Sequence, residues 1–562
     1  MLLFYATPSF VIAILFILVF GVFMSALPIS GFATSYKTPG VYLAVSLGGS
    51  ASSPGTQPIK ILLMGNKMGT AVSGSSPTIA LPAGTIADAT PQYLASEGDA
   101  GTYFGLGSEV HDMARAVFAQ YPNATVYGIA VAEGGGSAAS VVCTFATTAT
   151  ADYTIRLRMC GAVVDVPVAS GSTAATIATA VATATNAVTW LPYYAQTSTG
   201  AVTWTAKCNG PRGNDLVVLL SFVSSSGTET LITSSSTTSP GATTGIMSGG
   251  SASGNLYRFS GGTTQDSFAN ALSAITPTRY QRIVGACTDA TNIGRIATFV
   301  ASQAAITSQK RQQAVCATLA SLGTATTLAT GINSARTQIA WHYNSLVPAC
   351  MVAAQVTAAR VIGDSITGVV NALPGEESDP DANLSGVQLA TIPMQYSVDD
   401  QPTDTEVNSA LNNGLVPITA SNARAGYGVL CMSITSLSLV NGLQNYSVLY
   451  TNYVTVCDYV ADGEQANLAV RYAGFKLGSN DANGDPPKAP FVTTPQQIRA
   501  SILGDLKGYE EQGIVRDVDA NAELLAVEPD AGSPGRVNMS IPVEPTPWLV
   551  QMVGTVQQIQ SV

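Results

Sequence analysis

The feature that most limits the fold is an alternation of strand-like and helix-like sequence segments from Asp266 to about Val370. Short apolar runs such as "YQRIVGA", "QQAVCATL" and "RTQIAWHY" are separated by helical stretches, and a long helix is predicted from Pro348. Repeated strand-helix-strand units favour a parallel sheet that is covered by helices on both faces. The sequence therefore predicts a mixed α/β fold, and a length of 562 residues predicts several domains.

An earlier α/β unit precedes this region. "PIKILLMG", from Pro58 to Gly65, reads as a buried strand. Ser108 is placed to cap a helix with apolar residues at helical spacing, which ends at Tyr121 before the strand "ATVYGIAVA". These elements predict one further strand, helix and strand of the same sheet type.

Two glycine-rich borders, near 133–140 and 248–267, enclose text of a different character. "DYTIRLRM" and "VVDVPV" predict a β-hairpin, Ser172 is placed to cap an Ala-rich helix to about Thr185, and strands follow near "TWTAK" and "NDLVVLLSFV". Such a segment is typical of a protruding domain inserted into a surface loop.

The strongest local signal is "TTPQQIRASILGDLKGYEEQGIV". Thr494 is a predicted N-cap with Pro495 at N1 and Gln497 completing a capping box, and Gly513 supplies the stop. Upstream, a short helix is expected to end at Asn413-Gly414, followed by a strand in "YGVLCMSITSLS" and helix between Tyr453 and Phe475. Helical periodicity leaves Lys507, Glu510 and Glu511 exposed.

Only 10% of the residues are charged, where soluble proteins average about 25%. A neutral surface favours a subunit of an assembly, and the alternative is a secreted surface protein rich in Ser and Thr. The net charge of −11 without a basic stripe argues against a nucleic-acid partner.

The eight cysteines have no CxxC spacing and are predicted to be buried free thiols in a reducing compartment. Three of them, Cys143, Cys160 and Cys208, fall within one segment and could pair if the chain were exported.

The apolar run "FVIAILFILVFGVFM", from Phe10 to Met24, permits three readings. It lacks the positive residues of a secretory signal and is short for a membrane span, although "LLFY" upstream would lengthen it. In the third reading, which we prefer, residues 1–23 are upstream sequence and the chain starts at Met24. A genuine anchor and an export signal remain the alternatives.

Catalytic and ligand-binding patterns are weak. His111, predicted on the polar side of its helix, and His342 read as structural residues without metal-ligand spacing. "GDSI", Gly363 to Ile366, resembles a hydrolase nucleophile block but falls in a predicted helix and has no later histidine as base. The loops 379–386 and 480–485 lack the closing residues of calcium loops, and no phosphate or dinucleotide loop is complete. We therefore expect no enzyme activity, no metal and no cofactor.

Taken in order, "YKTPGVY", the α/β unit with its insertion, the strand and helix alternation, "LNNGLVPI" followed by "VLCMSITS", and "VTTPQQIRASILGDLKGYEEQGIV" resemble the tail sheath proteins of contractile phage tails, most closely the Mu-like branch. The resemblance runs from about residue 25 to the end. It implies a structural subunit that polymerises as stacked hexameric rings around a tail tube and contracts to drive the tube through a cell envelope.

The implied partners are further copies of the chain, the tube protein, and baseplate and tail terminator proteins, with no membrane for the native chain. The implied location is the virion, after assembly in the host cytoplasm. Exposed charges of the Thr494 helix, on Lys507, Glu510 and Glu511, are a candidate tube contact.

Prolines near both ends of the chain predict two extended arms. The resemblance to sheath proteins implies that these arms join neighbouring subunits by β-augmentation, in which an extended segment adds a strand to the next subunit's sheet. The alternative is that both ends pair within their own domain. The candidate arm residues have apolar or β-branched character: Val41, Tyr42, Leu43, Val45, Trp548, Leu549, Val550, Val553, Val556 and Ile559.

The predicted ranges are a leader 1–23, an N-terminal arm 24–45, an α/β part 46–136, an insertion 137–262, a middle domain 263–395, a C-terminal core 396–542 and a C-terminal arm 543–562.

Overall fold

The chain is represented by a computed structural model, which describes residues 59–253, 256–366, 387–420, 426–445, 449–479, 487, 489–533, 535–547 and 554. The described residues fall into two units. The larger unit comprises 59–304 and 310–455, and the smaller comprises 305–309 and 456–547. Helix α10, Thr451–Arg471, contributes residues to both.

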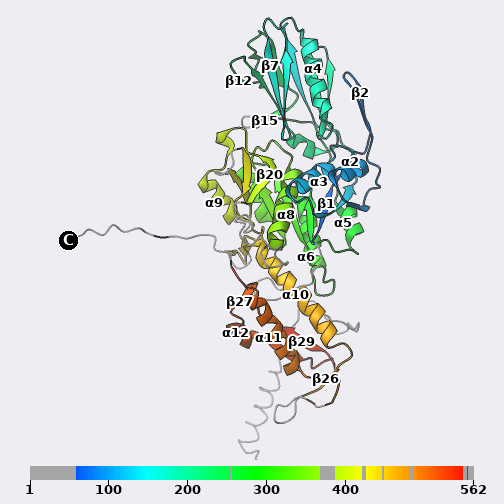
Figure 1. Ribbon diagram of the computed structural model, residues 1–562, viewed down its shortest axis with the longest axis vertical. Coiled ribbons are helices and arrows are strands. Elements are labelled where there is room, and N and C mark those ends of the chain that lie inside the picture. Colours follow the sequence, from blue (N-terminus) through cyan, green and yellow to red (C-terminus); the bar gives the residue numbers. More distant parts are fainter. Residues whose placement is uncertain are drawn as a thin grey trace, which may run out of the picture. The chain divides into compact units, whose positions relative to one another are not determined.

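A nine-stranded sheet in the order β20-β22-β21-β19-β18-β17-β1-β5-β4 organises the larger unit (Figure 1). The run from β21 to β5 is parallel, whereas β4 and β22 are antiparallel to their neighbours. The strands are β1 (Lys60–Asn66), β4 (Pro91–Leu94), β5 (Thr125–Val131), β17 (Arg282–Gly285), β18 (Gln313–Thr318), β19 (Thr337–Trp341), β20 (Val387–Pro393), β21 (Val416–Ala420) and β22 (Tyr427–Leu430).

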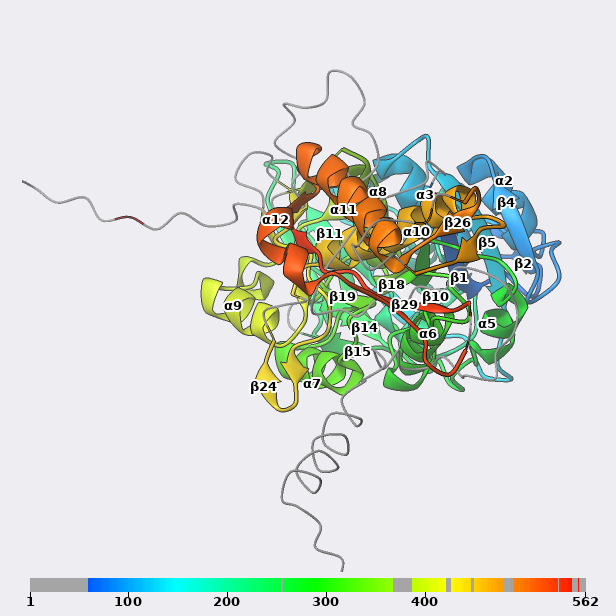
Figure 2. The ribbon, with the colours of Figure 1, turned by 90° about the horizontal axis from the view of Figure 1, so that it is seen from below.

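Helices cover both faces of this sheet (Figures 1 and 2). Ile61 and Leu63 of β1 pack into one core with α3 and α8, while Leu62 and Met64 pack into the opposite core with α5, α6 and α7. The predicted parallel α/β sheet is therefore confirmed. The helices are α2 (Glu97–Phe104), α3 (Glu109–Gln120), α5 (Ala269–Ile275), α6 (Ala290–Gln303), α7 (Leu322–Ile332), α8 (Ala349–Ile366) and α9 (Asp404–Asn412).

The segment between β5 and α5 has a hydrophobic core of its own, which extends from Ala139 to Phe259. A five-stranded and a four-stranded antiparallel sheet enclose this core with helix α4. The elements are β6 (Ser140–Ala146), β7 (Tyr153–Met159), β8 (Ala162–Val168), α4 (Ala174–Ala187), β9 (Tyr193–Ser198), β10 (Ala201–Ala206), η1 (Pro211–Asp215), β11 (Val218–Val223), β12 (Glu229–Leu231), β13 (Thr237–Thr238), β14 (Thr244–Ser248), β15 (Ser251–Ser253) and β16 (Leu256–Arg258). We call residues 137–262 the insertion.

Two local predictions in this region need correction. The cap of α4 is Thr173 and not Ser172, because the Thr173 hydroxyl accepts the Thr176 N–H while the Ser172 N–H is bonded to the Ala169 carbonyl. Strands β6 and β9 were not predicted, although "SVVCTFA" and "YYAQTS" contain β-branched or aromatic residues. Their apolar residues are buried only because the two sheets close around them.

Two hairpins complete the larger unit. They are formed by β2 (Val72–Ser75) with β3 (Thr78–Leu81), and by β23 (Leu439–Val440) with β24 (Leu443–Gln444). The strand predicted in "YGVLCMSITSLS" ends at Leu430. Beyond Leu430 the chain makes hydrogen bonds to other segments instead of continuing the strand. The Ser433 hydroxyl lies 2.7 Å from the Thr451 hydroxyl, and the Ser436 backbone N–H donates to the Thr337 carbonyl.

The smaller unit is built on α10 and α11 (Pro495–Glu511). As predicted, Thr494 and Gln497 form a capping box and Gly513 ends the helix at φ +72°. Its remaining elements are β25 (Lys476–Leu477), β26 (Val492–Thr493), β27 (Val515–Arg516), α12 (Val518–Asn521), η4 (Ala522–Leu524), β28 (Ala526–Pro529), β29 (Val537–Ser540) and β30 (Glu544–Pro545).

Candidate functional site

The order of the sheet creates a topological switch point beside β1. The chain passes from β1 to β5 on one side and, after the insertion, to β17 on the other side. In open α/β sheets, ligands bind in the crevice outside the carboxyl ends of the strands at such a point. The carboxyl ends of β1 and β17 are therefore where a catalytic site would be expected.

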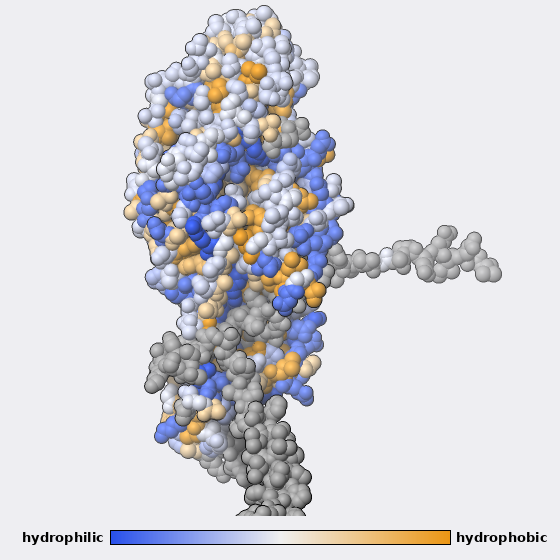
Figure 3. All heavy atoms as spheres, turned by 180° about the vertical axis from the view of Figure 1, so that it is seen from behind, coloured by the Kyte–Doolittle hydropathy of each residue, from blue (hydrophilic) through white to orange (hydrophobic). Residues whose placement is uncertain are grey.

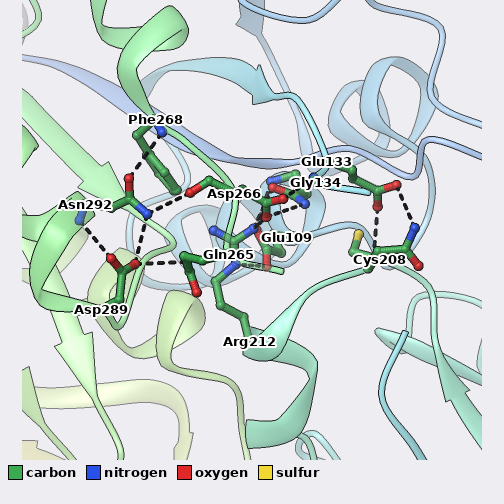
Figure 4. Close-up of polar contacts among 12 residues, drawn as sticks. Glu109, Glu133, Gly134, Cys208, Arg212, Gln265, Asp266, Phe268, Asp289 and Asn292 are labelled. Atoms are coloured by element: carbon green, nitrogen blue, oxygen red, sulfur yellow. Dashed lines mark hydrogen bonds and ion pairs between the residues drawn. The ribbon is translucent and has the colours of Figure 1, made fainter. Parts of the chain in front are cut away.

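A side chain of the insertion occupies this position instead (Figure 4). Arg212 of η1 forms an ion pair with Glu109 at the start of α3, with 2.8 Å between Nε and Oε1. Its guanidinium also pairs with the Asp266 carboxylate and donates to the Asn66 side-chain oxygen at 2.6 Å. Asn66 is the last residue of β1, so Arg212 reaches the strand end itself.

The carboxylates around Arg212 are held by further donors. Asp266 accepts hydrogen bonds from the Gly134 N–H and from the Asn66 amide, the latter at 3.0 Å. Glu109 accepts the Asn66 backbone N–H at 2.8 Å. Residues from β1, α3, the insertion and the segment after it are thus joined in one network, which we call the Arg212 cluster: Asn66, Glu109, Arg212 and Asp266.

The charges of the Arg212 cluster are buried, so each of them needs a partner of opposite charge to offset its loss of hydration. The Arg212 side chain is 6% exposed and that of Asp266 is fully buried. Burial raises the pKa of Glu109, and the neighbouring Arg212 charge opposes that rise. One cation and two carboxylates in low dielectric stabilise each other only as a set, because removing the cation leaves uncompensated buried charge.

A small cavity of about 40 Å³ remains beside the Arg212 cluster. Glu109, Asp112, Cys208, Arg212 and Asp215 are among its lining residues. This volume is enough for water, which needs about 10 to 15 Å³, but far below the roughly 300 Å³ of a typical ligand pocket. The arrangement can therefore fix the insertion to the sheet, and the cavity beside it is large enough to hold water.

Further contacts connect α3 and the insertion. The placement predicted for His111, on the polar side of its helix, was wrong. His111 is 1% exposed because α2 packs against it, with Glu97 of α2 3.8 Å from its Nε2, and its Nδ1 accepts the Gly107 N–H at 3.1 Å. Burial lowers the pKa of His111 to about 4. Nearby, the ammonium of Lys207 donates to the Leu106 and Thr189 carbonyls, and Arg115 lies 3.6 Å from the Trp190 ring centre.

His342 follows β19 and is fully buried. Its Nε2 lies 3.2 Å from the Pro393 carbonyl, so this nitrogen carries the proton, and Nδ1 has no partner among the described residues. Burial lowers the pKa of His342 to about 3. Both histidines thus occupy structural positions, as the sequence suggested.

The predicted tube-contact residues lie on α11 of the smaller unit. Lys507 and Glu511 are exposed, and the Lys507 ammonium forms an ion pair with Asp519 at 2.7 Å. Glu510 is only partly exposed, because its carboxylate accepts the Val518 N–H at the start of α12. Periodicity alone did not reveal this second role of Glu510.

The predicted leader and every predicted arm residue, from Val41 to Val45 and from Trp548 to Ile559, lie outside the described residues. So do both loops compared with calcium sites, 379–386 and 480–485. The helical placement predicted for Gly363 to Ile366 is confirmed, since these residues end α8. Within the described ranges, no group of three or more His, Cys, Asp or Glu side chains is arranged to hold a metal ion.

All eight cysteines lie in the described part and are free thiols, seven of them buried, as predicted. A membrane-crossing helix needs about 20 apolar residues, and none of the helices that the structure describes combines that length with that apolarity.

The residues of the Arg212 cluster were not predicted. The sequence contained a weak signal, because Asn66 follows a predicted buried strand and Arg212 stands in the "GPRGND" turn before another predicted strand. The switch point itself is seen only in the order of the sheet. What was missing is the pairing of two segments 146 positions apart.

Comparison with known proteins gives matches among solved structures. The sheath tail protein from Desulfitobacterium hafniense matches with a TM-score of 0.43 and 13% identity, covering 91% of this chain and 97% of its own. The sheath tail protein from Listeria innocua matches with a TM-score of 0.42 and 13% sequence identity, covering 88% of this chain and 93% of its own. A chain of the anti-feeding prophage baseplate matches with a TM-score of 0.32 and 12% sequence identity, covering 49% of this chain and 68% of its own. No protein-family model and no curated protein matches the chain.

Proposed function

We propose that the chain is a structural subunit of a contractile tail sheath, which polymerises around a tail tube and contracts to drive the tube through a cell envelope. The observation that carries the proposal is the occupied switch point. Arg212 of the insertion fills the place at which an α/β enzyme would bind its substrate, and binds the insertion to the sheet. This favours a building block over an enzyme, and the order of sequence motifs points to the sheath.

The surface of the protein supports assembly. Large apolar side chains are exposed on both units, with Val398 at 78%, Leu443 at 74% and Val470 at 82%. The face in Figure 3 is pale over the end where Figure 1 places β7 and α4, which indicates weakly polar residues and few charges there. Such a surface gains free energy when copies of the chain cover it.

Rigid subunits suit the proposed contraction, in which they rotate as bodies while extended arms act as hinges. The insertion is held to the sheet by more than the Arg212 cluster, since the Arg258 guanidinium also donates to the Asn344 side chain at 3.1 Å. A new lateral contact of roughly 400 Å² would supply on the order of 10 kcal/mol per subunit as an upper bound.

The predicted C-terminal arm begins later than expected, because Glu544 and Pro545 of β30 pair with β27 within the same unit. The segments 24–45 and 548–562 are the proposed links between subunits in stacked hexameric rings. The test is negative-stain microscopy of the purified full chain, for which we expect tubular sleeves. Deletion of 548–562 should leave the subunit folded and abolish the sleeves. Globular particles from the full chain under all conditions would contradict the proposal. A chain that retains 1–23 and fractionates with membranes would favour the anchored surface protein.

The proposed contact with the tube protein uses the exposed charges of α11. Reversal of Lys507 and Glu511 together should release the sleeve from the tube while the subunit still folds, because both side chains lie on the surface. Glu528→Lys, at an exposed position of β28, is the matched control. Unchanged assembly of sheath on tube would exclude these two residues as the contact without affecting the sleeve itself.

Baseplate and tail terminator proteins would bind the ends of such a sleeve, and the virion would be its location. Co-purification of the chain with tail components, without nucleic acid, is the expected result. Recovery of the chain only as a free monomer from particles that retain a tube would oppose this placement.

A further inference from the structure

Two cysteine side chains meet on the face of the sheet opposite α3 and α8. Cys287 lies two residues beyond the end of β17, and Cys316 lies within β18. Their sulfur atoms are 3.9 Å apart, and both side chains are at most 1% exposed. The two strands are direct parallel neighbours, so the thiols are held against each other by the sheet.

Gly285 makes this approach possible. A Cβ atom at this position would lie 3.2 Å from each of the two sulfur atoms and 2.6 Å from the Ile296 side chain. The missing side chain therefore leaves the space in which the sulfurs meet. Cys287 lies two residues after the last residue of β17, outside the paired part of the strand, so a local shift of its backbone need not break the β17 ladder.

We propose that Cys287 and Cys316 are a redox modification site, at which a small peroxide oxidant converts the dithiol into an intramolecular disulfide. The sulfur atoms must approach by roughly 1.9 Å to reach the bond length of about 2.05 Å. This inference is independent of the sheath proposal, because it needs only the pair of thiols.

The chemistry balances with hydrogen peroxide as oxidant. One thiol loses its proton, and the resulting thiolate attacks the peroxide. The O–O bond breaks to give a sulfenic acid and hydroxide, and the hydroxide takes up the released proton to form water. The second thiol then attacks the sulfenic sulfur, an S–S bond forms, and a second water leaves. Two thiols lose two protons and two electrons in total, and peroxide gains them as two molecules of water.

Burial limits the rate of this reaction. It raises the pKa of Cys287, so little thiolate is present at neutral pH. Oxidation should therefore be slow and pH-dependent, and the product should resist reductants until the segment opens. An exposed thiol of lower pKa would react faster, because more of it is present as thiolate and the oxidant reaches it directly.

The experiment treats the full chain with hydrogen peroxide, unfolds it, alkylates the remaining thiols and maps the peptides without reduction. We expect a peptide pair joined through Cys287 and Cys316, with two of the eight thiols protected, and its loss after dithiothreitol. Cys316→Ala should abolish the joined pair. Cys143→Ala, which removes a buried thiol of the insertion, should leave it unchanged.

Complete alkylation of both cysteines after prolonged oxidation would overturn the inference. So would sulfinic acid at either residue without any joined peptide, since this would show that the second thiol cannot reach. The map of the unmodified chain decides the question even if a variant fails to fold.

Discussion

Arg212 carries a charge that is almost completely buried, and its partners Glu109 and Asp266 come from outside the insertion. We expect Arg212→Met to lower the free energy of unfolding of the larger unit by about 3 to 5 kcal/mol, because two buried carboxylates lose their counterion. Urea unfolding followed by tryptophan fluorescence measures this loss.

The loss should be largely recovered when Glu109→Gln and Asp266→Asn are added, since neutral amides need no cation. Arg295→Met, at an exposed arginine of α6, is the control and should change little. A change below about 1 kcal/mol for Arg212→Met would mean that water replaces the guanidinium.

His342 should make the larger unit sensitive to acid. Its pKa is about 3 when folded and near 6.5 when unfolded, so the unfolded state binds more protons between these values. Stability is therefore fully present above pH 6.5 and falls by up to about 1.4 kcal/mol per pH unit as the pH decreases toward 3.

His342→Gln keeps an N–H donor for the Pro393 carbonyl and cannot titrate. We expect a flatter stability profile between pH 4 and 6.5 in urea titrations of this variant. Parallel profiles for the two proteins would show that other groups determine the acid response.

At the scale of elements, helix α11 begins with a complete capping box. Thr494→Ala should cost about 1 kcal/mol of local stability, because the Gln497 N–H loses its acceptor. Hydrogen exchange of the amides in the first turn is the suitable measurement, as it reports on the smaller unit alone. Gln497→Glu keeps the box and should retain the protection, whereas equal exchange in all three proteins would contradict the assignment.

Predictions from the sequence were correct where an element depends on residues close together in the chain, and less accurate where it depends on contacts between distant segments. The caps of α3 and α11 involve residues three positions apart, and both were predicted correctly. At α4, adjacent Ser172 and Thr173 both suit a cap, and contacts of the preceding loop decide between them. Strand β22 ended earlier than its apolar text suggested, because Ser433 and Ser436 bond to distant segments.

At the scale of the whole molecule, the insertion has a core independent of the nine-stranded sheet. Its ends lie side by side, since the Ser137 N–H donates to the Thr263 hydroxyl at 3.1 Å. We expect residues 137–263 to fold when produced alone, with dispersed amide resonances and one cooperative unfolding transition. Arg212 would then be solvated, which removes the burial cost of its charge.

Trp204→Ala is the control for this experiment, because Trp204 is fully buried in that core and its loss should unfold the isolated segment. Poorly dispersed resonances for the unaltered segment would show that the insertion depends on the sheet.

By itself the sequence determined the alternation of strands and helices, the α/β class, the presence of a distinct segment between glycine-rich borders and the best helix caps. These properties depend on neighbours within a few residues, which the sequence displays directly. Only the tertiary structure decided that His111 is buried, that Arg212 fills the switch point and that Cys287 meets Cys316. Each of these results from segments brought together by the packing of the sheet, and the energy of such contacts depends on burial that no local pattern records.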